Sequence, residues 1–218
     1  MEITKEQIQY IDNRLKKEGI KYWDIRIEMV DHVVSDLEKN AKTSDFKIEL
    51  DVTLKRIGWS GNLSDINRES WQNVNRYYRK MYHKGFVHFF KKFKNVSIFA
   101  TSLLVFYVVS EMISFKAFKN LSFTLFVAPM LFVLIEFVKS LFKKYGRSVN
   151  LDYGFMYLLM SFLILNAFPH FFIDQTETVQ KIVWFVILSV HFIAFYSGYH
   201  LYKKTILKVE EMRKQLLS

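Results

Sequence analysis

Residues 121–142 read LSFTLFVAPMLFVLIEFVKSLF, a run in which only Glu136 and Lys139 carry a charge. A helix needs about 20 mostly apolar residues to cross a hydrocarbon layer of roughly 30 Å. Backbone N–H and C=O groups inside lipid need partners within the segment, and a helix provides them. This stretch therefore predicts a transmembrane helix, and it governs how the sequence on both sides is interpreted.

Three more apolar runs of similar length occupy residues 96–115, 151–172 and 182–202. A soluble protein that buried four such runs would need an unusually large polar shell to cover them. We therefore predict an all-α fold, in which a small N-terminal cytosolic helical domain precedes a four-transmembrane-helix bundle. The four runs are its predicted spans, and residues 203–218 are expected to continue as a cytosolic C-terminal helix that docks on the N-terminal domain or on another subunit.

The distribution of charge predicts the orientation of the chain. Sixteen Lys and Arg residues lie in residues 71–94 before the first run, between the second and third, and after the fourth, against Lys116, Lys119 and Lys181 on the other side. The positive-inside rule therefore predicts a multi-pass protein of the cytoplasmic (inner) membrane of a bacterium, with both termini in the cytoplasm. The polar start MEITKEQIQ does not resemble a cleavable signal peptide, so the first span is expected to direct insertion.

Composition and motifs favour a non-enzymatic protein. The chain has no cysteine, which excludes disulfides, Cys-ligated zinc, iron–sulfur clusters and thiol catalysis. Phosphate-binding glycine loops, nucleophile elbows and kinase motifs do not occur. We therefore predict no catalytic residue, no cofactor-binding residue and no metal site. A membrane enzyme acting on lipid remains an alternative, although it would need convergent acid–base or metal-binding groups near one interface.

Residues 1–70 carry 12 basic and 14 acidic side chains and read as a compact helical domain. Thr4 and Gln7 form a capping-box pattern at the start of the first helix. A second amphipathic helix is expected over about 22–40, and a third should end at Gly58. A fourth helix should begin near Ser64 and continue into the next segment, forming a continuous helix up to the first span.

The second and third helices carry a family resemblance. The sequence Arg26 to Glu38 reads RIEMVDHVVSDLE, and the next amphipathic helix ends in Ile57-Gly58-Trp59. Over roughly residues 20–70 this order resembles the HAAS or permease-prefix domain, although the proline that usually follows the Gly turn is missing. The resemblance implies a regulatory, membrane-attached module of bacterial membrane proteins, often beside transport or transcription functions, without catalytic residues.

The polar face of the second helix is a candidate partner surface, formed by Glu28, Asp31, His32 and Asp36. Glu28, His32 and Asp36 are spaced by four, so they share a helix face and could ligate a divalent metal. One helix seldom supplies enough ligands, and the spacing differs from H-E-x-x-H. We therefore favour a solvated face that contacts a protein partner.

Residues 71–94 form a basic, aromatic juxtamembrane neck with 7 cations and no carboxylate. Cations amid aromatic rings suit either nucleic acid or the headgroup region of a membrane. Because the neck directly precedes a span, we predict contact with the anionic lipid of the inner leaflet and no nucleic-acid partner. Part of the neck could lie on the leaflet as an amphipathic helix. The residues expected at the membrane surface are Arg76, Arg79, Lys80, Lys84, Lys91, Lys92 and Lys94.

Four polar side chains within the predicted spans form a candidate intramembrane site: Glu136, Lys139, Asn166 and His191. An intramembrane carboxylate is a functional candidate by default. Lys139 could instead pair with Glu136 while it extends to the interface. His191 should lie roughly 7 Å further from the cytoplasm than Glu136, so the two could meet if their helices are neighbours.

Two functions remain open on the sequence alone. The first is a membrane regulatory or accessory subunit whose cytosolic domain binds a protein partner, within a homo-oligomer or a larger membrane-protein complex. The alternative is a small transporter or channel subunit with a polar path through Glu136, Asn166 and His191. The residues fix neither the partner nor the helix order in the bundle.

Overall fold

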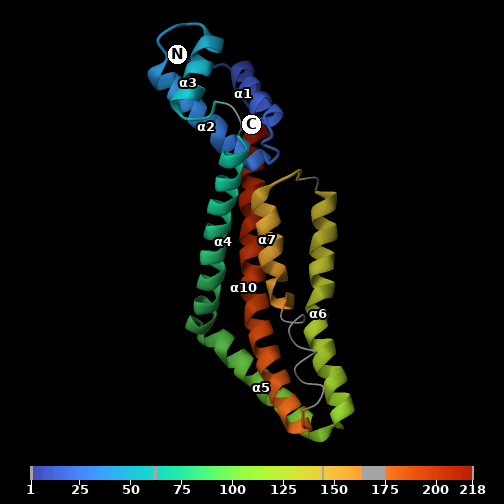
Figure 1. Cartoon of the computed structure of the whole chain (residues 1–218). Coiled ribbons are helices and arrows are strands. Elements are labelled where there is room, and N and C mark those ends of the chain that lie inside the picture. Colours follow the sequence, from blue (N-terminus) through green and yellow to red (C-terminus); the bar gives the residue numbers. More distant parts are fainter. Residues whose placement is uncertain (1, 61–62, 144, 164–174, 218) are drawn as a thin grey trace.

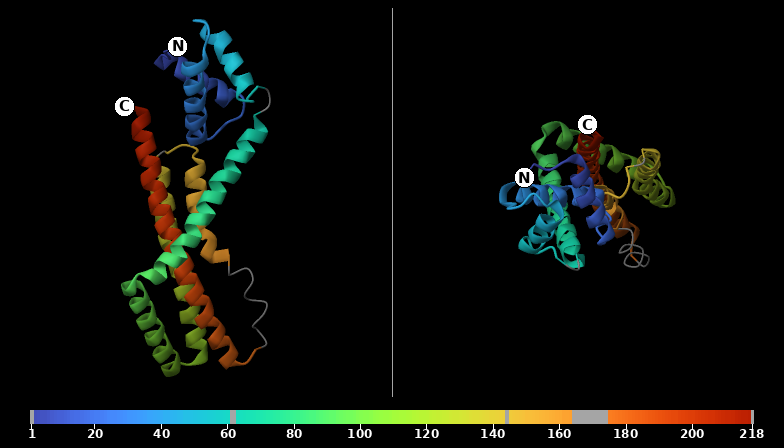
Figure 2. Two further views of the ribbon diagram at one scale, coloured as in Figure 1. Left: turned by 90° about the vertical axis from the view of Figure 1, so that its left-hand side faces the viewer. Right: turned by 90° about the horizontal axis from the view of Figure 1, so that it is seen from above.

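The computed structural model describes residues 2–60, 63–143, 145–163 and 175–217, and every regular element in that part of the chain is a helix (Figure 1). The predicted all-α class is therefore confirmed. The elements are gathered into a small helical domain at one end and a bundle of long helices that extends away from it. The C-terminus lies beside the N-terminal domain (Figure 2).

The N-terminal domain consists of α1 (Lys5–Lys17), α2 (Trp23–Asn40) and α3 (Phe46–Arg56). The capping box predicted at Thr4 and Gln7 is present, and Asp45 caps α3 through the N–H groups of the next turn. Buried apolar side chains from all three helices form its core, among them Leu15, Val33, Leu37, Leu50 and Leu54. The two helix caps depend on residues that lie close together in the sequence, whereas the core joins all three helices.

Helix α4 (Ser64–Lys91) runs without interruption through the predicted domain boundary at residue 70 and through most of the neck. It ends at Lys92, whose backbone is extended (φ −96°, ψ 106°), and α5 (Phe93–Met112) starts at the next residue. The chain turns sharply at this point (Figure 2). The expectation of a continuous helix into the first span is therefore wrong, because the single residue Lys92 interrupts it.

Both helices beside the break at Lys92 pack on α10. Tyr78, Tyr82 and Phe89 are buried and hold the neck along α10. Phe89 of α4 and Phe99 of α5 both contact the ring of Phe192 in α10. Three aromatic side chains of the neck are therefore covered by other helices, whereas Phe90 and Phe93 remain exposed.

Three helices are long and apolar enough to cross a membrane by length and composition: α5, α6 (Phe115–Phe142) and α10 (Glu177–Leu217). These spans indicate a membrane protein. In place of the third predicted span there are α7 (Val149–Leu159) and the 3-10 helix η1 (Met160–Leu163), which together are shorter than a span. The remainder of that run, at residues 164–172, falls outside the described residues, so a fourth crossing is not established by the fold alone.

Helix α10 is the axis of the bundle. It is 41 residues long, so the predicted fourth span and the C-terminal helix form one rod. Helices α4, α6 and α7 pack along it, and it reaches from the far end of the bundle to the N-terminal domain (Figure 1). Near its C-terminus, Val209 is fully buried against Tyr145 and Leu151, with Trp23 of α2 packed beside them. The C-terminal helix thus contacts the N-terminal domain.

Small residues allow α10 to approach its neighbours closely. A Cβ added at Gly198 would lie 2.5 Å from the carbonyl oxygen of Tyr157 in α7, and one at Gly154 would lie 3.1 Å from the Thr205 side chain. The first contact is with backbone, which cannot rotate away. The second is with a side chain that can adjust.

We predict that Gly198→Ala separates α7 from α10 and destabilises the bundle. Overpacking costs about 1–3 kcal/mol, which outweighs the gain in helix propensity of up to about 1 kcal/mol. Thermal unfolding in mild detergent should show a lower midpoint for Gly198→Ala, with a smaller decrease for Gly154→Ala. Equal midpoints for the two variants would show that the backbone contact does not control the packing.

Candidate functional site

A buried carboxylate joins the N-terminal domain to the bundle. Asp24, near the start of α2, is 1% exposed. Its oxygens accept hydrogen bonds from Ser148 Oγ (2.7 Å), the backbone N–H groups of Val149 (3.1 Å) and Asn150 (3.0 Å), and Asn150 Nδ2 (2.7 Å). Val149 and Asn150 are the first residues of α7. Asp24 therefore caps a helix that lies more than 120 residues away in the sequence.

This arrangement gives hydrogen-bond partners both to the Asp24 carboxylate and to the first N–H groups of α7. The first N–H groups of a helix have no partner inside it, and a negative charge there is favoured by the helix dipole. Ser148 completes the cap because its hydroxyl also accepts from the N–H of Leu151 at 3.3 Å. A buried charge is costly unless hydrogen bonds compensate it, and here four donors from the α7 end do so.

The same cluster extends into α4 and α10 through Asn150. The Asn150 Oδ1 atom accepts from the Tyr78 hydroxyl of α4 (3.2 Å) and from Lys208 Nζ of α10 (3.3 Å). Thr205 of α10 donates to the Tyr78 hydroxyl over 3.1 Å. Burial raises the pKa of Tyr78 to about 12, so the phenol stays neutral and can donate. We call the set of Asp24, Tyr78, Ser148, Asn150, Thr205 and Lys208 the junction cluster.

Neighbouring contacts strengthen the junction at the start of α2. The Trp23 indole N–H donates to the carbonyl of Tyr145 at 2.9 Å, and the Trp23 backbone N–H donates to the carbonyl of Arg147 at 3.1 Å. Burial, and then a hydrogen bond to Asp152 of α7, raise the pKa of Tyr22 to about 12. Three successive residues of α2 therefore hold the segment that leads into α7.

The sequence analysis did not identify Asp24 or Ser148. Asp24 reads as an ordinary acidic residue in the first turn of α2, and Ser148 lies before a run that was expected to start at residue 151. The available signal was a Ser followed by residues able to start a helix, which is a typical N-cap pattern. No local pattern could show that the carboxylate comes from another domain.

Glu136, the predicted intramembrane acid, lies between α6 and α10 and is 5% exposed. Lys139 Nζ donates to one carboxylate oxygen (3.1 Å), and Lys203 Nζ of α10 donates to the other (3.2 Å). The expected pairing with Lys139 is present, and Lys203 adds a partner that the sequence did not indicate. The group therefore acts as a polar clamp between two helices.

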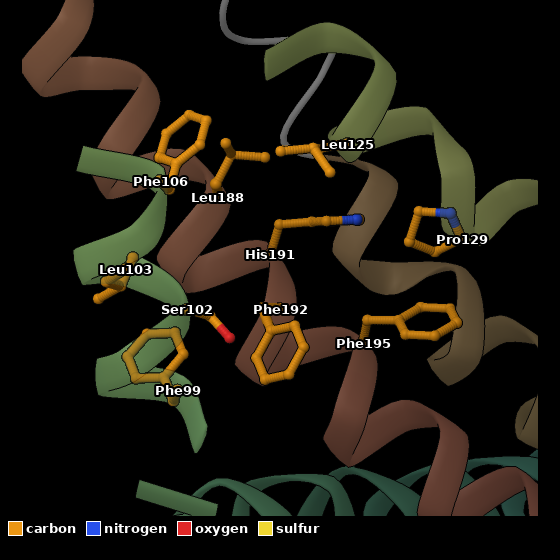
Figure 3. Close-up of a pocket in the computed structure, with 10 residues that line it drawn as sticks. All are labelled: Phe99, Ser102, Leu103, Phe106, Leu125, Pro129, Leu188, His191, Phe192 and Phe195. Atoms are coloured by element: carbon orange, nitrogen blue, oxygen red, sulfur yellow. The ribbon is translucent and has the colours of Figure 1, made fainter. Parts of the chain in front are cut away.

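His191 lies deeper in the bundle, on α10, and is 3% exposed. Its Nδ1 atom is 3.2 Å from the carbonyl oxygen of Ser161, and its ring stacks on Phe126 with centroids 4.1 Å apart. Figure 3 shows the ring beside a cavity of about 200 Å³, pointing away from Phe99 of α5. The cavity is lined almost entirely by aromatic and aliphatic groups.

The structure does not bring Glu136 and His191 together. The register between α6 and α10 pairs Phe126 with His191 and Glu136 with Lys203, which places the two polar groups about 15–18 Å apart along the helices. The predicted offset of roughly 7 Å was wrong because ring stacking, and not the ends of the apolar runs, sets the register. Asn166, the third member of the predicted polar path, lies outside the described residues.

The predicted partner surface on α2 is partly free and partly occupied. Glu28, Asp31 and His32 are exposed, and His32 contacts the ring of Trp59 at 6.3 Å between centroids. Asp36 is instead engaged by Arg56 of α3 and Asn40; although burial raises its pKa, these hydrogen bonds hold it below the usual value. A carboxylate bound by a guanidinium is a poor metal ligand, and the described residues contain no group of three or more potential ligands that could hold a metal ion.

The seven cations of the neck are all exposed: Arg76, Arg79, Lys80, Lys84, Lys91, Lys92 and Lys94. They lie on α4, on the Lys92 break and at the start of α5, next to a helix apolar enough to cross a membrane. The aromatic residues interleaved with them divide into a buried face and an exposed face. Tyr78, Tyr82 and Phe89 face the other helices, whereas Phe90 and Phe93 are exposed.

Comparisons with family models, with curated proteins and with solved structures found no match to this chain. The geometry therefore carries the functional argument.

We predict that Asp24→Ala weakens the attachment of the N-terminal domain to α7. The substitution leaves the N–H groups of Val149 and Asn150 without their carboxylate, at a cost of about 3 kcal/mol. Hydrogen exchange of these two amides in the detergent-solubilised protein should accelerate. Asp31→Ala, an exposed change on the same helix, should leave both amides unchanged. Unaltered exchange in Asp24→Ala would contradict the role assigned to the cap.

We also predict that Glu136→Gln lowers stability modestly. The side chains of Lys139 and Lys203 are 62% and 44% exposed, so solvent screens both ion pairs and the expected loss is about 1 kcal/mol. Thermal unfolding midpoints would be compared with those of Glu111→Gln, which alters a carboxylate that is itself 56% exposed. A larger loss for Glu111→Gln would argue against a clamp at Glu136.

Proposed function

We propose that this chain is a non-enzymatic regulatory or accessory subunit of the bacterial inner membrane. Its N-terminal domain, which resembles the HAAS or permease-prefix domain over residues 20–70, binds a protein partner or a second copy of the chain in the cytoplasm. The helical bundle sits in the bilayer and receives the effect of that binding. The chain then works as part of a homo-oligomer or a larger membrane-protein complex.

The junction cluster is the observation that carries this proposal. A cytosolic domain on a flexible linker could not transmit binding to the membrane, because its motion would be independent of the bundle. Here the Asp24 carboxylate holds the start of α7, and Asn150 connects that point to α4 and α10. A change in the position of α2 must therefore displace the bundle helices or break a buried, fully hydrogen-bonded cluster.

Surface exposure supports a partner on α2. Glu28, Asp31 and His32 take no part in the junction and remain accessible. The opposite side of α2 is buried in the domain core, so these exposed charges have a defined position. Such charges favour electrostatic recognition of a complementary surface. The alternative role as a transporter or channel subunit receives less support, because Glu136 is held by two lysines and His191 stacks on Phe126 and meets Phe162 edge-on.

Connectivity supports a topology with four crossings and both termini in the cytoplasm. Helix α6 ends at the end of the bundle that carries the N-terminal domain, whereas α10 begins at the opposite end (Figure 1). The intervening chain has to return across the same distance, and the run that begins with α7 would supply that crossing. The concentration of cations on the side of the N-terminal domain favours the cytoplasm for that side.

A crosslinking experiment tests the proposal. The intact protein would be crosslinked in native membranes, solubilised in mild detergent and sized. We expect a species larger than the monomer, and Asp31→Lys should reduce its amount about tenfold because a charge reversal at a recognition surface is strongly unfavourable.

The matched control is Asp65→Lys, which reverses an exposed carboxylate on α4, away from the proposed surface. It should leave the crosslinked species unchanged. A wild-type protein that remains strictly monomeric, with no crosslinked partner in its own membrane, would refute the proposed function.

A further inference from the structure

A second feature lies where α4 crosses α10, outside the junction cluster. A groove of about 670 Å³ opens between the two helices, directly before the start of α5. Its charged and titratable lining consists of Lys84, His88, Lys91, Lys92, His200 and Lys204. We call this site the basic groove.

Helix packing creates the basic groove. A Cβ at Gly85 of α4 would lie 2.0 Å from Ser197 Oγ of α10, so the two helices touch there with no room for a larger residue. The Ser197 hydroxyl donates to the carbonyl of Tyr82 at 2.6 Å and fixes the crossing point. Residues three or four positions apart share a helix face, so the lysines and histidines of both helices converge on the same space.

The positive charge of the basic groove is not balanced by an acidic side chain among the described residues. None of its lining residues is acidic. Elsewhere in the described chain, Lys139, Lys143, Lys181 and Lys203 each pair with a carboxylate, whereas none of the four groove lysines takes part in an ion pair within the described residues. His200 lies within electrostatic range of His88, Lys92 and Lys204. Converging like charges repel one another, and a bound anion would relieve that repulsion.

We propose that the basic groove binds the headgroup of an anionic lipid that carries two phosphates. Phosphate oxygens accept hydrogen bonds from ammonium and imidazole groups, and four lysines supply more charge than a single phosphodiester would balance. The groove opens at the end of a helix apolar enough to span the membrane, at the depth expected for headgroups. This site is more specific than a general contact between the neck and the membrane surface, because two of its lining residues, His200 and Lys204, come from α10.

Apolar side chains next to the basic groove fit the rest of such a lipid. Phe93 is 86% exposed and Phe90 is 57% exposed, both beside the lysines that line the groove. The stacked rings of Phe99 and Phe192 continue the apolar surface toward the bilayer centre. A soluble polyphosphate or a nucleic acid would leave these rings in water, which is why the arrangement favours a lipid.

The experiment uses the full-length protein in detergent and native mass spectrometry. Diphosphatidylglycerol, with two phosphates, and phosphatidylglycerol, with one, would be added at equal concentrations. We expect one diphosphatidylglycerol to remain bound about tenfold more than phosphatidylglycerol, because each additional cation–phosphate contact strengthens binding severalfold. The double variant Lys84→Gln, Lys204→Gln should lose about tenfold of that binding.

The control variant Lys116→Gln, Lys119→Gln removes the same charge from exposed positions at the start of α6, outside the groove and outside the neck. It should retain binding within about twofold, and lipid-free unfolding midpoints of both variants should match the wild type. Equal losses in the two variants would overturn the site, because the binding would then be a general effect of charge. Displacement of the lipid by equimolar pyrophosphate or by a short oligonucleotide would equally overturn the assignment to a lipid.

Discussion

A single buried carboxylate determines how the two parts of this protein are joined. Asp24 supplements the Ser148 cap at the start of α7, because its carboxylate accepts hydrogen bonds from the backbone N–H groups of Val149 and Asn150. Because both the charge and the helix end are buried, neither can exchange its partner for water without loss. The hydrogen bonds of Asp24 therefore fix the position of α2 relative to α7, whereas a flexible linker alone would leave that position variable.

Helix α10 distributes this constraint along the molecule. Lys208 and Thr205 contact the junction cluster, Lys203 holds Glu136, and His191 meets the carbonyl of Ser161. Four polar contacts thus occur on one rigid element at different depths. Between them, Gly198 allows α7 to approach closely. A rod with contacts at several levels transmits a displacement at one end to the other more directly than separate helices could.

Much of the fold can be predicted from the sequence where its determinants are local. The box at Thr4 and Gln7, the turn at Gly58 and the start of α4 near Ser64 depend on residues within a few positions of one another. The length of each apolar run can likewise be read directly from the sequence. Three of them form helices long enough to cross a membrane, as expected.

The remaining features depend on contacts between distant segments. Asp24 and Ser148 are 124 positions apart, and the stacking of Phe126 on His191 shifts α10 along α6 in a way that hydropathy cannot express. At the break at Lys92, the rings of Phe89 in α4 and Phe99 in α5 both pack on Phe192 of α10. The contact between Glu136 and Lys139, which are three residues apart, was therefore predicted correctly, whereas the distance from Glu136 to His191 was not.

The unequal lengths of α5 and α6 have a consequence for the surrounding bilayer. Helix α5 has 20 residues and spans about 30 Å, whereas α6 has 28 residues and spans about 42 Å. A hydrocarbon layer that matches α5 leaves the last turns of α6, with Lys139, among the headgroups or requires α6 to tilt. Hydrophobic mismatch therefore falls unevenly within one subunit, so a change in membrane thickness would act differently on α5, which follows the break at Lys92, and on α6.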